Sequence, residues 1–187
     1  MITNQQTNIG GVMKKIILVL TFLTLPLSSY AQDAFYVSGL LGLGQLDINV
    51  NEGDFGSELN YGVRAGLLFN DHVAAGLFYL RSDNEKTIST NAVNATISSD
   101  FNPLMAEVVY YFNEADENSF YLSGMLGIAD VGLNSENETA VGASAGYNFM
   151  LAPNYSLAPQ LTYIKTLGEN DKDATHISAL INFTIWL

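Results

Sequence analysis

Two side chains of opposite charge, Arg64 and Glu107, lie within segments that are otherwise apolar or built of small residues. Arg64 stands five positions before Phe69, and Glu107 stands five positions before Phe112. If each aromatic marks the same end of a strand, the two charges lie at a similar depth. A buried charge requires a partner, so the sequence predicts an ion pair between them in an enclosed interior. A proton or ion pathway through the same residues is the alternative.

His176 and Ser178 form a second candidate for chemistry, because they lie two residues apart on one face of a predicted strand. A histidine activates a serine when an orienting acid lies within hydrogen-bond reach. The pair resembles part of the His-Ser-acid triad of the outer-membrane lipid A deacylase. That enzyme works on its lipid-facing surface, whereas the alternation of side chains along a strand puts both residues here on the inward face. In addition, no Asp or Glu follows Asp173 to complete a triad in the same order. We expect no enzyme.

Arg81 and Lys165 occupy equivalent positions, each two residues after a tyrosine. If the chain spans an outer membrane, outward cations near the outer membrane interface would contact lipopolysaccharide phosphates. The alternative is that these side chains only extend toward water at the membrane surface. The residues Asp47, Asn49, Asn51 and Glu58 match part of a calcium-loop spacing, but the glycine of the sharp turn is missing from its place. We expect a flexible acidic loop and no dedicated metal site, with weak binding of divalent cations as the alternative.

Composition removes several classes of function. The chain has 187 residues with 7 Lys and Arg against 19 Asp and Glu, a net charge of −12, which argues against nucleic-acid binding. It has no cysteine, so disulfides, thiolate metal sites and a lipid-modified cysteine are excluded. We expect no cofactor, and an acidic exterior.

The chain contains an internal repeat that indicates two similar halves. The segment FYVSGLLGL at 35–43 returns as FYLSGMLGI at 120–128, and GVRAG at 62–66 returns as GASAG at 142–146. Each half follows one plan of four segments, and the segments alternate between bulky apolar residues and small or polar ones, the period of a β-strand. Two halves of four strands predict an all-β fold of eight strands.

The length of these segments favours a membrane. They span about 10 to 12 residues, as in transmembrane barrels, whereas soluble strands average about 5 or 6. The even-to-odd connections are short and the odd-to-even connections are longer, as expected for periplasmic turns and extracellular loops. We predict an eight-stranded antiparallel up-and-down transmembrane β-barrel. A soluble barrel of lipocalin type is the alternative, although its solvated face would be unusually poor in charge.

Several individual residues are placed by this prediction. Aromatics at the turn ends, Trp186 among them, are expected at the inner membrane interface, and Phe101 is expected at the outer one. Pro159 lies inside the seventh segment and predicts a bulge or local break in the strand.

The N-terminus predicts export. Residues 13–31 have a short basic start, an apolar run and a small-x-small site ending at Ala31, which is typical of a cleaved signal peptide. Residues 1–12 precede it as an upstream extension, which leaves Met1 and Met13 as alternative starts. The apolar run at 16–25 is shorter than the roughly 20 residues that span a bilayer. The barrel domain is expected at 32–187.

The signal peptide, the opening FYVSG segment and the aromatic-rich last strand resemble the small outer-membrane β-barrel family of the opacity, OmpA-like and OmpX-like proteins. The family ends on an aromatic, whereas here Trp186 is followed by Leu187. The resemblance implies a monomer of the Gram-negative outer membrane, surrounded by lipid and lipopolysaccharide, with roles in adhesion, serum-type resistance or envelope integrity.

From these observations we expect a non-enzymatic surface or structural protein. The predicted loop 82–100 is its expected contact with a host or cell-surface ligand. A porin-like barrel conducting ions or small solutes is the first alternative, although eight strands leave an interior that side chains fill. A lipid A-modifying enzyme is the second.

Overall fold

The computed structural model describes residues 34–48, 58–89, 94–131, 137–167 and 173–187. The predicted extension at 1–12 and signal peptide at 13–31 lie outside these residues, as does most of the calcium-like loop. Gln32–Leu187 forms one compact unit. Its strands are β1 (Ala34–Ile48), β2 (Glu58–Asn70), β3 (Val73–Ser89), β4 (Asn94–Tyr111), β5 (Ser119–Val131), β6 (Asn137–Ala152), β7 (Tyr155–Thr166) and β8 (Ala174–Trp186).

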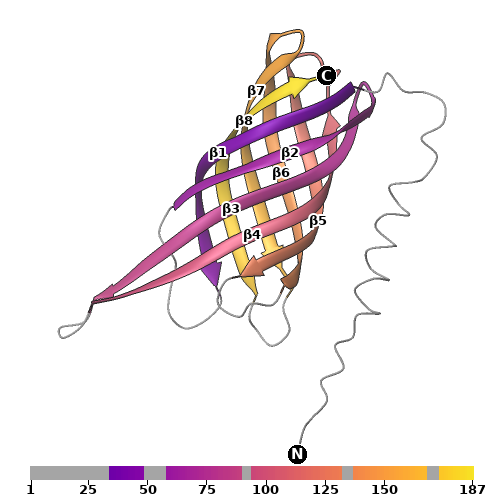
Figure 1. Cartoon of the computed structure of the whole chain (residues 1–187). Helices are drawn as coiled ribbons and strands as arrows, with labels where there is room; N and C mark the ends of the chain where they lie inside the picture. The colour runs from indigo at the N-terminus through magenta and orange to yellow at the C-terminus, as the bar shows by residue number, and fades with distance from the viewer. Residues whose placement is uncertain (1–33, 49–57, 90–93, 132–136, 168–172) are drawn as a thin grey trace, which may run out of the picture. The chain divides into compact units, whose positions relative to one another are not determined.

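The eight strands form one closed barrel in which each strand pairs with its neighbours in sequence. All pairs are antiparallel, and β1 pairs with β8 to close the sheet. The start of β1 and the end of β8 lie at the same end of the barrel, and the connections β2–β3, β4–β5 and β6–β7 lie there too (Figure 1). The predicted all-β, up-and-down barrel is therefore confirmed.

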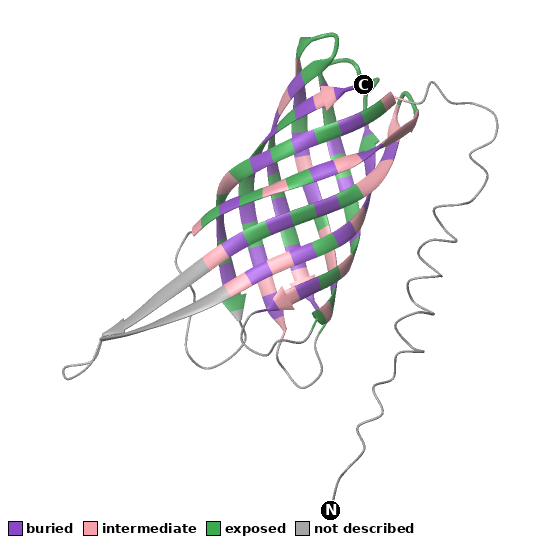
Figure 2. Cartoon of the chain, in the orientation of Figure 1, coloured by how far each residue is buried: buried purple, intermediate pink, exposed green. Residues whose placement is uncertain are grey.

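Successive residues along each strand face opposite sides of the wall, and Figure 2 shows the resulting alternation of buried and exposed positions. The inward positions are buried, including polar ones such as Ser38, Gln160 and Asn182. The outward positions are exposed and mostly large and apolar, among them Leu41, Val63, Leu77, Val108, Leu126, Leu161 and Ile181. This distribution reverses that of a soluble barrel of lipocalin type, whose apolar face lines the interior.

The sequence repeat corresponds to a repeated packing contact in the lumen. Tyr36 on β1 pairs with Gly66 on β2, and Tyr121 on β5 pairs with Gly146 on β6. A Cβ atom at Gly66 would lie 2.7 Å from the Tyr36 hydroxyl oxygen, and one at Gly146 would lie 2.5 Å from that of Tyr121. Each half of the chain thus leaves out one side chain so that a tyrosine of the preceding strand can lie against the wall.

The predicted loop 82–100 is wrong in its boundaries. Residues 83–89 and 94–100 continue β3 and β4 as a paired ribbon, with the register running to Ser89 and Asn94. The neighbouring strands stop earlier: the outermost pairs are Asn60 with Ser82 on one side and Phe101 with Val131 on the other. The ribbon therefore projects beyond the barrel, at the end opposite the C-terminus (Figure 1).

Pro159 interrupts one ladder without shifting its register. The β6–β7 pairs include Gly146 with Gln160 and Phe149 with Leu157, but the two pairs between them are missing. On its other side Pro159 still pairs with Ile181. The predicted break is thus confined to one ladder and contains no bulge, because proline removes a hydrogen-bond donor without adding a residue.

Two aromatics predicted at the membrane interfaces face the lumen instead. Trp186 is 8% exposed, and its ring lies 5.4 Å from the Tyr36 ring between centroids. Phe101 is fully buried and stacks on His176 at 4.9 Å. Along their strands, both lie in step with the inward polar residues. The prediction considered only that they are aromatic and overlooked this alternation.

Candidate functional site

The structure brings Arg64 on β2 and Glu107 on β4 together inside the barrel. Arg64 Nε lies 2.7 Å from Glu107 Oε2, and Arg64 Nη2 donates to Glu107 Oε1 at 3.0 Å. Two parallel contacts of this kind form the fork geometry in which arginine and carboxylate interact most strongly. The residues are 4% and 1% exposed, so the ion pair is shielded from bulk water.

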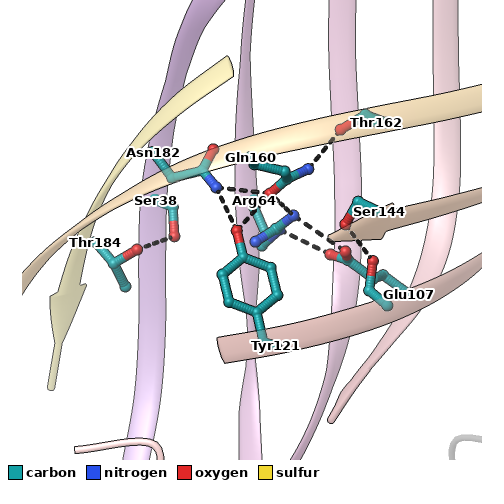
Figure 3. Close-up of polar contacts among 10 residues, drawn as sticks. Ser38, Arg64, Glu107, Tyr121, Ser144, Gln160, Thr162, Asn182 and Thr184 are labelled. Atoms are coloured by element: carbon teal, nitrogen blue, oxygen red, sulfur yellow. Dashed lines mark hydrogen bonds and ion pairs between the residues drawn. The ribbon is translucent and has the colours of Figure 1, made fainter. Parts of the chain in front are cut away.

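A hydrogen-bond network extends the ion pair across the lumen (Figure 3). Gln160 Oε1 on β7 accepts from Arg64 Nη2 at 2.8 Å, from the Tyr121 hydroxyl at 2.8 Å and from Asn182 Nδ2 at 2.6 Å. Asn182 also donates to the Tyr121 hydroxyl at 3.0 Å, and Gln160 Nε2 donates to Thr162 at 2.6 Å. The network connects side chains of β2, β4, β5, β7 and β8.

The network accounts for a charged residue in the middle of the barrel. Removing a charge from water costs several kcal/mol per ion, and the attraction to a partner repays this only with good geometry and further hydrogen bonds. Arg64 has both, and its guanidinium carbon also lies 5.7 Å from the centroid of the Phe78 ring on β3. The arrangement holds the guanidinium between strands on different sides of the lumen.

Apolar layers lie on both sides of the network. Toward the end of the barrel where β1 begins and β8 ends, Tyr36, Tyr111, Tyr121 and Trp186 form an aromatic cluster, with Tyr111 and Trp186 ring centroids 6.3 Å apart. Toward the opposite end, the buried cluster includes Leu46, Leu80, Phe101, Ile164 and Leu180. An eight-stranded barrel encloses an interior just wide enough for side chains, and these layers occupy it.

His176 and Ser178 do not assemble nucleophilic chemistry. Both are buried, and no hydrogen bond joins them or links either to another side chain of the described residues. Asn60 is also fully buried without a partner, and the three side chains gather around Gly44, where a Cβ atom would meet all of them. The histidine is thus a lumen residue whose ring stacks on that of Phe101.

The side chains of Arg81 and Lys165 lie outside the lumen, and each forms an ion pair with an aspartate. Arg81 Nε lies 2.9 Å from Asp83 Oδ1, and Lys165 Nζ lies 2.9 Å from Asp173 Oδ2. Their side chains are 44% and 39% exposed, so both cations remain accessible at the barrel surface. Neither is close to the Arg64 network, and the predicted sites are therefore separate.

Sequence reasoning missed Gln160, Tyr121 and Asn182 as members of the lumen network. The strand alternation puts all three on the inward face, but nothing in the sequence shows that strands β2, β5, β7 and β8 bring them to one depth. Only the barrel register aligns them. The useful signal would have been that an inward charge requires several inward polar groups at the same depth.

Within the described residues, no group of three or more His, Cys, Asp and Glu side chains is arranged to hold a metal ion. The same residues contain no helix long and apolar enough to cross a bilayer.

The architecture defines a class of protein: a closed antiparallel barrel with an apolar outer wall and a lumen filled by an ion-pair network. The model of the outer membrane protein beta-barrel domain matches residues 16–183. The chain belongs to this family, and the protein is accordingly a small β-barrel of the bacterial outer membrane. No curated protein sequence matches the chain.

Solved structures with the same fold have low sequence identity. The chain is similar to the Neisserial surface protein A, with a TM-score of 0.63 and 19% identity over 81% of this chain and 96% of that one. It is also similar to the outer membrane protein OprG from Pseudomonas aeruginosa, with a TM-score of 0.55 and 12% identity over 83% and 96%. At these identities the similarity shows the fold alone.

Proposed function

We propose that the protein is a non-enzymatic surface protein that presents the β3–β4 ribbon, residues 83–100, to a partner outside the cell. The observation that carries the proposal is the division of the molecule: side chains occupy the lumen, while two paired strands project past the barrel rim. A filled lumen disfavours transport, and the absence of a hydrogen bond between His176 and Ser178 disfavours catalysis. The projecting ribbon is what remains for contact.

The orientation supports this proposal. The start of β1, the end of β8 and the short connections lie at one end, which in outer-membrane barrels is the periplasmic end. The ribbon then lies on the extracellular side, where acidic residues also gather, namely Asp47, Asp83, Asp100, Asp130 and Asp173. A partner with a neutral or basic surface fits this end better than a polyanion does.

A deletion tests the proposed role of the ribbon. Residues 84–99 are replaced by Asn-Gly, which connects the strands by a two-residue turn. Cells carrying this variant should lose attachment to host cells or to a second bacterial cell, while the purified barrel keeps its heat-modifiable migration. Shortening the connection at 168–172 is the matched control. Equal attachment by the ribbon deletion and the wild type would refute the proposed contact.

We propose further that Arg81 and Lys165 contact lipopolysaccharide phosphates, with Asp83 and Asp173 competing for the same cations. The two exposed ion pairs are worth little by themselves, about 0 to 1 kcal/mol, so a phosphate can displace the acid at low cost. The double variant Arg81→Gln/Lys165→Gln should co-purify with less lipopolysaccharide, and Asp83→Asn/Asp173→Asn with more. Unchanged amounts in both would leave the cations as rim residues only.

A further inference from the structure

The outer wall of the barrel carries a recess at the strand pair that closes it. The recess has a volume of about 610 Å³ and is lined by residues of β1, β2, β6, β7 and β8. Pockets that hold drug-sized molecules measure roughly 300 to 1,000 Å³. The recess is therefore large enough for a ligand of many carbon atoms.

The strand register explains why the recess is there. It places five outward residues in one row around the barrel: Leu59, Leu43, Ala179, Leu161 and Ala145. Ala179 stands between two leucines, and its single methyl group leaves the wall lower than the side chains on either side. The depression thus lies where a small residue, Ala179, stands between two larger ones, Leu43 and Leu161.

The lining determines the chemical class of the ligand. Its outward members are aliphatic or small, and Leu41 and Ile181 complete it beside Ala179. Gln160 is the one lining residue with a polar side chain, and its amide is engaged in the lumen network. The recess therefore offers shape and apolar contact, without a charge or free hydrogen-bonding group for a polar headgroup.

The position of the recess determines the occupant. Along β8, Ala179 lies between Ile177 and Ile181 on the outward apolar surface, which in an outer-membrane barrel faces the hydrocarbon of the bilayer. We propose that the recess over Ala179 binds one acyl chain of an outer-membrane lipid. A second copy of the chain is the competing occupant, but specific protein interfaces bury roughly 1,200 to 2,000 Å² in total, more than a hollow centred on one alanine provides.

The bound chain lies across the β8–β1 closure. Its contacts with Leu43 on β1 and Ile181 on β8 join the two strands that no turn connects. A lipid held there contributes to keeping the barrel closed. This role is independent of the ribbon at the extracellular end, so it stands or falls separately from the proposed surface function.

Native mass spectrometry of the purified full chain with dimyristoyl phosphatidylethanolamine tests the site. Ala179→Leu fills the recess, and Ala106→Leu adds the same atoms to an outward alanine on β4, away from it. Both variants should fold, because the added leucine faces lipid. We expect the wild type and Ala106→Leu to retain one phospholipid, and Ala179→Leu to bind it about tenfold more weakly, equivalent to about 1.4 kcal/mol.

Three results would overturn the proposal. Equal retention by Ala179→Leu and the wild type would show that the recess is not the site. A dimer in the wild type that disappears in Ala179→Leu would assign the recess to a second copy of the chain. Retention of a lysophospholipid with the same acyl chain and a different headgroup should match that of the first lipid, since a dependence on headgroup charge would contradict an acyl-chain site.

Discussion

Arg64 and Glu107 depend on each other inside the lumen. If either side chain is removed, the other remains as a buried charge without a partner. Breaking a buried pair by removing one partner typically costs about 3 to 5 kcal/mol, whereas replacing both by apolar residues of similar size is often neutral or stabilising. The ion pair therefore need not add net stability. Its clearer effect is to restrict which strands can lie at the same depth in the barrel.

We predict that Arg64→Met lowers the free energy of unfolding by about 3 to 5 kcal/mol, because Glu107 is left buried and unpaired. The double variant Arg64→Met/Glu107→Leu should recover most of that loss. Urea unfolding in lipid vesicles, arranged as a double-mutant cycle, measures both. If the losses of the two single variants simply add in the double variant, the two side chains do not act as a pair.

His176 gives a second prediction, because its two ring nitrogens are buried without partners among the described residues. His176→Phe keeps an aromatic ring against Phe101 and removes the unpaired groups, each of which costs about 1 to 3 kcal/mol. We predict a gain in unfolding free energy of about 1 to 2 kcal/mol by the same urea assay.

The control for His176 is Ser38→Ala. The Ser38 hydroxyl is hydrogen-bonded to that of Thr184 at 2.7 Å, so its removal should cost about 1 kcal/mol. A loss of stability in His176→Phe comparable with that in Ser38→Ala would mean that the histidine nitrogens are satisfied in the folded protein.

Strand β7 has a local defect in its pairing with β6. The ladder between β6 and β7 lacks two pairs where Pro159 has no N–H to donate. In a bilayer an unsatisfied backbone group is costly, since no water is available to bond it. The outward position of Pro159 puts this defect in the apolar part of the wall.

We therefore predict that Pro159→Val restores the missing hydrogen bond and raises the unfolding free energy by about 0.5 to 1.5 kcal/mol. Hydrogen exchange should slow at Tyr147 and Asn148, which stand opposite the gap. Leu157→Val, on the same strand with its pairing intact, is the control and should change little. Faster exchange at these positions in Pro159→Val would show that the proline holds the strand in place.

Strand alternation was the most predictable feature of the chain, because the period of two follows from the backbone and the two faces meet different surroundings. Arg64 and Glu107 could be placed at one depth from their distances to Phe69 and Phe112. The extension of β3 and β4 past residue 82 could not be predicted, since the polar residues of 83–100 lack the apolar alternation that marks the wall. Polar composition indicates water and does not distinguish a ribbon from a loop.

The described part of the chain is a barrel whose lumen is filled by side chains and whose outer surface carries the candidate binding surfaces. The aromatic layer, the ion-pair network and the apolar layer follow one another through the lumen. The projecting β3–β4 ribbon, the cations Arg81 and Lys165 and the recess at Ala179 all lie on the outside of the barrel. A protein built in this way should interact through its surface and should not pass solutes through its centre.

Single-channel recording of the purified wild-type protein in a planar lipid bilayer tests this account most directly. With the Arg64 network and both apolar layers in place, we predict no resolvable conductance steps at moderate voltage, and none in the ribbon deletion. The variant Arg64→Ala/Trp186→Ala, which empties part of two layers, should give measurable steps if it inserts. Steady openings of the wild-type protein would contradict the account, because they would show a continuous aqueous path through the lumen.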